Sequence, residues 1–173
     1  MKTLSEIAKH FDGIQEIPGN QGFKNRFLAY VMDIVGFKKG YARCMLFANV
    51  CSVLYFTQFN SSLINKYKNC FTPGAVSSSN NFKKYYPEMI SDTPSQNSIA
   101  IWQRYTKGKA TWRGHAGIVI WLNGPILLSV EGNTNNAGSS EGDGVYIKER
   151  NIYAKPDNGL RFKGFINLPD GYA

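Results

Sequence analysis

The apolar residues of this 173-residue chain change their spacing about halfway along it. In the first half they recur at the three- and four-residue spacing of a helix, and in the second half they alternate with polar residues as in strands. Because no helical segment separates the strands, a doubly wound parallel sheet is not expected. The pattern predicts an α+β fold, in which N-terminal helices pack against a C-terminal, mostly antiparallel sheet of five to six strands.

Four helices are predicted in the first half. The first opens at a Thr3-x-x-Glu6 capping box, and the second ends at Gly36, a residue that suits the left-handed position after a helix. The third is apolar nearly all round and is therefore expected at the centre of the molecule. The helices cover about residues 3–11, 24–36, 42–56 and 61–71, and the Pro-, Gly-, Ser- and Asn-rich segment 72–81 is predicted to be a loop.

Five segments of the second half read as strands separated by turn-forming residues. They are residues 98–102, 115–121, 126–132, 144–149 and 161–168. No internal repeat or linker divides the chain. We therefore predict a single domain over 1–173, with a helical part over about 1–90 and a sheet part over about 96–170.

Composition limits the environment and the partners. A formal charge of +8 favours an anionic partner, such as nucleic acid, a membrane surface or an anionic wall polymer. Three cysteines leave at least one free thiol, which fits synthesis in a reducing compartment. The N-terminal residues have no apolar core of a signal peptide, and no run of about 18 apolar residues could span a membrane.

Cys44 is the first candidate for chemistry because it stands at the predicted start of the third helix. A thiol there lies near unpaired amides and the positive end of the helix dipole, which favour the thiolate. The alternative is a small buried hydrophobic residue, the usual role of a free cysteine. Cys51 lies among apolar residues of the third helix, and the sequence suggests no basic or acidic partner for Cys70, so both are expected to be structural.

His115 is the candidate base. It is expected at the start of a strand, on the same face as Gly117, which would leave space for a substrate or a helix. His10 lies in the first helix and is expected to be solvated. The next strand ends with Glu131 and Asn133, which share a face if the chain stays extended, and either could orient an imidazole. Alternatively, Asn133 simply caps a turn.

The sequence offers no metal or cofactor motif. A zinc site usually contains a short-range cysteine or histidine pair, and none is present. A DxDxDG calcium loop, a phosphate-binding GxxxxGK[ST] loop and a serine nucleophile elbow are also missing, although residues 139–144 (SSEGDG) are acidic enough for weak cation binding. We therefore predict no metal and no cofactor.

Four basic residues precede His115 without an acidic residue among them. They are Arg104, Lys107, Lys109 and Arg113. Such a loop could attract an anionic wall polymer or the carboxylates of a stem peptide, or it could be an ordinary solvated loop.

The four candidate residues and the segments around them resemble the CHAP family, the cysteine, histidine-dependent amidohydrolases/peptidases of the papain-like superfamily. RCMLFANV is similar to the family's WCxxFV helix, GHAGIVIW to its histidine strand, and SVEGNTNNAGSSEGDGV to the strand that ends in E-x-N. The resemblance covers most of the chain and implies a papain-like fold. Two positions depart from the family pattern: Arg43 replaces an aromatic residue, whose place Tyr41 could take, and Ser95-Gln96 replaces a Pro-Gly-Asp turn.

The resemblance implies peptidoglycan hydrolysis at an amide bond of the stem peptide. Cys44 would be the nucleophile and His115 the general base and then acid, while Glu131 and Asn133 would orient His115 or assist the oxyanion. Tyr41, Arg43, Trp112 and Arg113 would contact substrate.

Delivery and partners follow from the same hypothesis. The protein is expected to be a monomer that acts either as a phage-type lysin or as an antibacterial effector. It would reach the wall by way of a holin or a secretion system. An effector would also have an immunity protein. Nucleic acid and membrane are not expected partners. Two rivals remain: a papain-like enzyme on another amide substrate, and a non-catalytic basic module that binds the wall.

Overall fold

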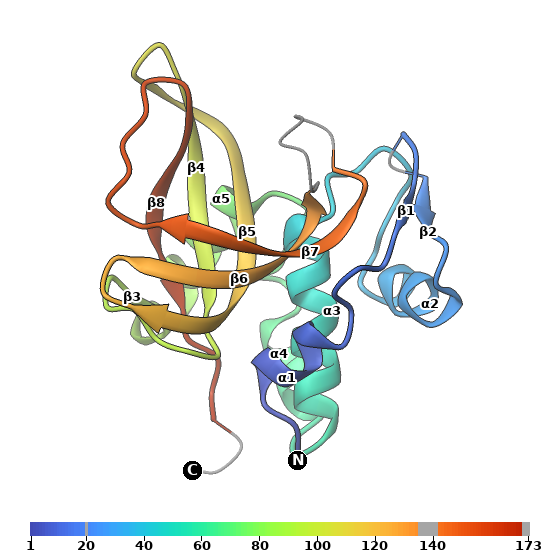
Figure 1. Ribbon diagram of the computed structural model, residues 1–173. Helices are drawn as coiled ribbons and strands as arrows, with labels where there is room; N and C mark the ends of the chain where they lie inside the picture. The colour runs from blue at the N-terminus through green and yellow to red at the C-terminus, as the bar shows by residue number, and fades with distance from the viewer. Residues whose placement is uncertain (20, 135–141, 171–173) are drawn as a thin grey trace.

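The computed structural model describes residues 1–19, 21–134 and 142–170, and its helices precede its main sheet as the sequence predicts (Figure 1). The helices are α1 (Leu4–Lys9), α2 (Arg26–Ile34), α3 (Cys44–Thr57), α4 (Ser62–Tyr67) and α5 (Ala75–Tyr85), followed by the 3-10 turn η1 (Pro87–Met89). A small hairpin of β1 (Glu16–Ile17) and β2 (Gly22–Phe23) lies between α1 and α2.

The main sheet has six strands in the order β3-β8-β4-β5-β6-β7, and every neighbouring pair is antiparallel. The strands are β3 (Ile90–Ser91), β4 (Ile99–Thr106), β5 (Lys109–Asn123), β6 (Ile126–Thr134), β7 (Gly144–Asn151) and β8 (Gly159–Ile166). The five predicted strands are thus confirmed, and β3 adds a short edge strand. In Figure 1 the sheet is strongly twisted, and the α3 helix stands beside it.

Local signals at the ends of the first two helices work as the sequence predicts. The Thr3 side chain accepts from the Glu6 amide, and the Glu6 carboxylate accepts from the Thr3 amide, which completes the capping box of α1. After α2, Gly36 is left-handed (φ 83°), and its N–H and that of Phe37 bond back to Asp33 and Met32. These bonds end α2 as a Schellman motif.

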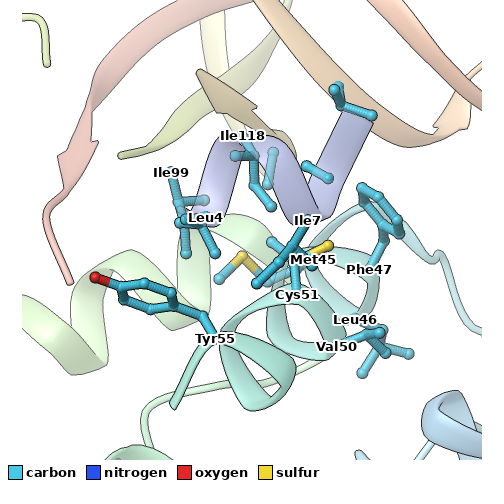
Figure 2. Close-up of a cluster of buried hydrophobic side chains, with 14 of the residues drawn as sticks. Leu4, Ile7, Met45, Leu46, Phe47, Val50, Cys51, Tyr55, Ile99 and Ile118 are labelled. Carbon is cyan, nitrogen blue, oxygen red and sulfur yellow. The ribbon is translucent and has the colours of Figure 1, made fainter. Parts of the chain in front are cut away.

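The α3 helix lies at the centre of the larger core because it is apolar on nearly every side. Most of its residues are buried, from Cys44 through Phe56. Figure 2 shows Met45 and Cys51 of this helix near side chains from α1 and from the sheet, including Leu4 and Ile118. This packing fixes the first turn of α3 relative to β5 and β6.

The opposite face of the sheet carries a second, smaller apolar cluster. Its buried members are Ala100, Trp102, Val119, Leu127, Ile152 and Phe165. On β6, alternate residues divide between the two clusters as the strand period requires, with Leu127 in the smaller and Val130 in the larger. The smaller cluster therefore lies on the same face of β6 as the polar residues that follow Leu127.

The prediction of a loop over residues 72–81 was wrong, because most of this segment forms α5. The α5 helix has buried side chains at Ala75, Val76 and Phe82, and Ser78 Oγ accepts a hydrogen bond from the Thr72 amide at 2.8 Å. Burial of an apolar side against the sheet stabilises a helix whose serines and asparagines have low helix propensity.

Two further expectations about β5 are corrected by its length. His115 does not open the strand but lies in its middle, since β5 begins at Lys109. The basic segment is not a loop: Arg104 belongs to β4, Lys109 and Arg113 belong to β5, and only Lys107 lies in the tight turn between them. The turn has φ values of 50° at Lys107 and 71° at Gly108, which match the right-handed twist of a hairpin.

Among the helices of the described residues, none is long and apolar enough to cross a membrane.

Candidate active site

His115 and Glu131 lie side by side on neighbouring strands and share the face of the smaller apolar cluster. The distance between His115 Nε2 and Glu131 Oε2 is 2.7 Å. Gly117 makes this contact possible, because a Cβ at that position would lie 2.7 Å from Glu131 Cγ. The space beside His115 is therefore filled by the Glu131 side chain, not by substrate or a helix.

The Glu131 side chain is fully buried, and both of its carboxylate oxygens have hydrogen-bonding partners. Besides His115, Ser129 Oγ donates to Oε1 at 2.7 Å. Arg150 on β7 donates from Nε to Oε1 at 2.9 Å and from Nη2 to Oε2 at 2.6 Å. A bidentate guanidinium of this kind fixes both the position and the plane of a carboxylate.

These contacts determine the charges of the pair. Burial alone would raise the pKa of Glu131, but the charges and hydrogen bonds of His115 and Arg150 outweigh it and lower the pKa to about 2. Burial alone would lower the pKa of His115, but Glu131 and Cys44 outweigh it and raise the pKa to about 10. At neutral pH the site therefore holds a buried carboxylate beside an imidazolium.

Cys44 is the first residue of α3, as expected, and lies close enough to His115 for its thiol to contribute to raising the pKa of that imidazole. Since Nε2 of His115 faces Glu131, the other ring nitrogen, Nδ1, is the one available to the thiol. The N-cap residue Arg43 makes no side-chain hydrogen bond to the first turn of α3, so its side chain leaves the amides of that turn without a cap. Cys44 is 3% exposed, and access to its sulfur is narrow.

Asn133 does not join Glu131 on one face, which corrects the expectation of an extended chain. The β6–β7 ladder shifts between Glu131 and Thr134, and Asn133 has a left-handed φ of 55°. Its backbone N–H donates to Glu16 Oε1 at 2.8 Å. Its side-chain Oδ1 is buried and has no hydrogen-bond partner among the described residues. Of the two candidates, Glu131 is thus the residue that contacts His115.

Arg43 is fully buried, so its expected contact with substrate is corrected as well. Its guanidinium forms an ion pair with Glu16 and also donates to the carbonyl of Gly22 at 3.2 Å. The rings of Phe23 and Phe37 lie beside it, at 5.3 and 5.5 Å from Cζ. The side chain points into the protein, away from solvent.

The other three predicted contact residues are accessible. Tyr41 is 37% exposed and lies three residues before Cys44, and Trp112 is 77% exposed on β5. Arg113 is also exposed, with its guanidinium carbon 5.4 Å from the Trp112 ring centre. All three side chains are therefore accessible to a ligand.

The remaining cysteines and the first histidine lie away from this cluster. Cys51 and Cys70 are buried, and burial raises the pKa of both thiols. His10 is exposed at the end of α1. Within the described ranges no group of three or more His, Cys, Asp or Glu side chains could hold a metal ion, and residues 139–141 of the acidic SSEGDG segment lie outside those ranges.

Three residues of this region were missed from the sequence: Ser129, Arg150 and Glu16. Ser129 shares the face of Glu131 two residues earlier, so strand periodicity could have indicated it. Arg150 on β7 pairs with Leu127 on β6, which lies four residues before Glu131. Only the length of the arginine side chain brings its guanidinium to the Glu131 carboxylate. Glu16 and Arg43 are 27 residues apart, and no local pattern connects them.

Comparison of the chain with protein-family models, with curated proteins and with solved structures finds no match.

A hollow of about 260 Å³ lies at the other end of α3, beside Tyr55 and Asn167, and none of its lining residues belongs to the cluster around Cys44. The chemical capacity of the site therefore rests on its own geometry: a thiol at a helix start, an imidazole near it, and a buried carboxylate that fixes the imidazole.

Proposed function

We propose that the protein is a cysteine hydrolase that cleaves an amide bond of bacterial peptidoglycan, with Cys44 as nucleophile. One observation carries the enzymatic part: His115 is held between Cys44 and a carboxylate that is itself fixed by Ser129 and Arg150. A histidine with only a packing role has no need of a buried carboxylate at 2.7 Å with three further donors. This is the arrangement that nucleophile–base pairs require.

The proposed reaction has two halves. The Cys44 sulfur, as thiolate beside the His115 imidazolium, attacks the carbonyl carbon of the amide. Open amides in the first turn of α3 bind the oxyanion. His115 then gives its proton to the leaving amine, and the C–N bond breaks to leave a thioester on Cys44. Next, His115 takes a proton from water while the resulting hydroxide attacks the thioester; the C–S bond breaks, the carboxylic acid product leaves, and the Cys44 thiolate and the His115 imidazolium are restored.

The substrate class rests on the resemblance to CHAP domains and on charge. The segments around Cys44, His115 and Glu131 are similar to that family, whose papain-like fold and wall substrates we extend to this chain by proposal. The formal charge of +8 and the exposed basic residues of the β4–β5 hairpin favour an anionic polymer. The scissile bond would be the link between muramic acid and the stem peptide, or a bond within the peptide or its cross-bridge.

The test is digestion of purified peptidoglycan by the wild type and by Cys44→Ala, with fragments identified by mass spectrometry. Cys51→Ala is the matched control, because it removes a buried thiol of the same helix that does not contact His115. We expect fragments from the wild type and the control but not from Cys44→Ala, and the fragment masses identify the bond. Equal digestion by Cys44→Ala would refute the assignment of the nucleophile.

Failure of all three proteins to release fragments would separate the rivals. Fast alkylation of Cys44 in such a protein would favour a cysteine enzyme on another amide substrate. An inert Cys44 in a protein that binds the wall would favour a non-catalytic module.

A further inference from the structure

Glu16 and Arg43 form a second buried ion pair, which lies next to the nucleophile but takes no part in the proposed reaction. We propose that Glu16 is a positioning residue whose carboxylate holds the start of α3 and the end of β6 in fixed relative positions. The inference rests on the proposed function in one respect: it takes Cys44 and His115 as the reacting pair.

The Glu16 carboxylate connects three segments that are distant in the sequence. Glu16 itself belongs to the β1–β2 hairpin. One carboxylate oxygen, Oε2, binds the guanidinium of Arg43, the residue that precedes Cys44. The other, Oε1, accepts from the backbone N–H of Asn133 at 2.8 Å. A single side chain therefore spans the nucleophile helix and the strand that carries Glu131.

The two elements held by Glu16 also pack tightly against each other. A Cβ on Gly132 would lie 2.7 Å from Phe47 Cβ and 3.4 Å from the Arg43 carbonyl oxygen. The same Arg43 carbonyl accepts the first helical hydrogen bond of α3, from the Phe47 amide at 2.7 Å. Because Gly132 directly follows Glu131, a shift of α3 against β6 changes the distance between Cys44 and His115.

A contribution to stability does not account for this pair. Arg43 and Glu16 are 0% and 4% exposed, and removing two charges from water offsets much of their attraction. Two nitrogens of the guanidinium, Nε and Nη2, are buried without hydrogen-bond partners among the described residues. An apolar pair of similar volume would be expected to stabilise the fold as well as this one does. What the apolar pair cannot do is bind the Asn133 amide.

Three variants separate positioning from stability. Glu16→Gln removes the charge, Glu16→Asp keeps it on a shorter side chain, and the double variant Glu16→Met/Arg43→Met replaces the pair by apolar groups. The matched control is Asp157→Asn, which removes one negative charge from the exposed pair of Asp157 with Arg161 at 3.5 Å. Each protein is measured for its thermal unfolding midpoint and for the rate of Cys44 alkylation by iodoacetamide, followed on the Cys44 peptide by mass spectrometry.

We expect the double variant to unfold near the wild-type temperature but to alkylate Cys44 more slowly, by on the order of tenfold to a hundredfold, because small misplacements reduce reactivity by such factors. Glu16→Gln should lose a similar factor, Glu16→Asp should recover part of it, and Asp157→Asn should match the wild type. Wall digestion should fall in the same order, through kcat and not through KM.

Alkylation at the wild-type rate in a folded Glu16→Gln or double variant would overturn the inference. So would a double variant that does not fold, because the pair would then be a requirement for folding. The alkylation assay uses no wall substrate. A wild type that digests no peptidoglycan but shows the expected order of alkylation rates would therefore refute the wall function and leave the positioning role in place.

Discussion

Glu131 and Glu16 are both buried carboxylates, and both are paired with an arginine, yet their surroundings shift their pKa values in opposite directions. Glu131 accepts hydrogen bonds from Ser129 and Arg150 and contacts His115, and its pKa is lowered to about 2. Glu16 has Arg43 and one backbone amide, and burial raises its pKa to about 7 in spite of them. Burial raises the pKa of both carboxylates, and at Glu131 the charge of His115 together with the charge and hydrogen bonds of Arg150 decides the sign.

The difference matches the tasks that we assign to the two residues. A carboxylate that fixes a catalytic imidazole must stay ionised while the imidazole gains and loses a proton, and many donors secure this. A carboxylate that only holds two segments together needs fewer partners. Asp143, which faces Glu16 from the start of β7, raises the pKa of Glu16 further. The structure therefore contains one fully satisfied polar cluster and one partly satisfied ion pair, within reach of the same cysteine.

The largest expected effect is that of Glu131→Gln, which removes the charge from the satisfied cluster. Arg150 loses its ion pair and His115 loses the group that fixes its tautomer. We expect kcat for wall digestion to fall by on the order of 10⁴, as when the carboxylate of a catalytic triad is neutralised. The free energy of unfolding should fall by up to about 3 kcal/mol, since two partly buried cations lose their partner. Urea unfolding and a digestion assay measure both quantities.

Glu16→Gln is the matched variant for this comparison, because it makes the same substitution at the other buried carboxylate. Its loss of activity should be smaller by at least about tenfold, since it acts only by displacing the reacting groups. Equal losses for the two variants would contradict the division between an orienting and a positioning carboxylate.

The next expected effect is on the pH dependence of stability. The pKa of Glu131 is lower in the folded state than its ordinary value of 4.5, so its contribution is present above pH 4.5 and is lost as the pH falls toward 2. The pKa of Glu16 is raised, so its contribution is present below pH 4.5 and is lost as the pH rises through about 7. The contribution of Glu131 is on the order of 3 kcal/mol.

Unfolding free energies of the wild type and of the two glutamine variants, measured by urea from acid to neutral pH, test these signs. Relative to Glu131→Gln, the wild type should lose stability on acidification. Relative to Glu16→Gln, the wild type should instead lose stability as the pH rises toward neutrality. If the difference in unfolding free energy between the wild type and each variant changed with pH in the same direction, the two carboxylates would have similar surroundings, contrary to their hydrogen bonds.

The fold class was predictable because whole segments carry one hydrophobic period. The α3 helix is apolar on all sides and is buried, and five strands alternate as strands do. Periodicity did not determine which side of α2 is buried: Phe27, Tyr30 and Ile34 are 54%, 65% and 58% exposed, while Leu28 and Met32 are buried. Both sides of that helix are apolar, and only packing against neighbouring elements selects one. The same packing stabilises α5 against its local propensities.

The site was predictable only where its residues lie on one strand or at a helix start. Cys44, His115 and Glu131 were candidates because position and spacing indicate chemistry. Asn133 lies outside the predicted geometry because a left-handed residue breaks the alternation, which no periodic pattern shows. The Arg150 and Glu16 contacts depend on strand order and on a hairpin whose residues contact Arg43, and these are properties of the folded chain alone.

The smallest expected effect is that of Ser129→Ala, which removes one hydrogen bond from Glu131 and leaves its other contacts in place. Arg150 Nε still donates to the same oxygen at 2.9 Å, so the free energy of unfolding should fall by only about 1 kcal/mol. Ser52→Ala is the control, because Ser52 is equally buried but donates within α3, to the Ala48 carbonyl at 2.7 Å. Acid unfolding of Ser129→Ala should begin at higher pH than that of the wild type, and Ser52→Ala should show no such shift. An unchanged acid transition in Ser129→Ala would mean that Arg150 and His115 alone lower the pKa of Glu131, and that the Ser129 hydrogen bond has no part in its difference from Glu16.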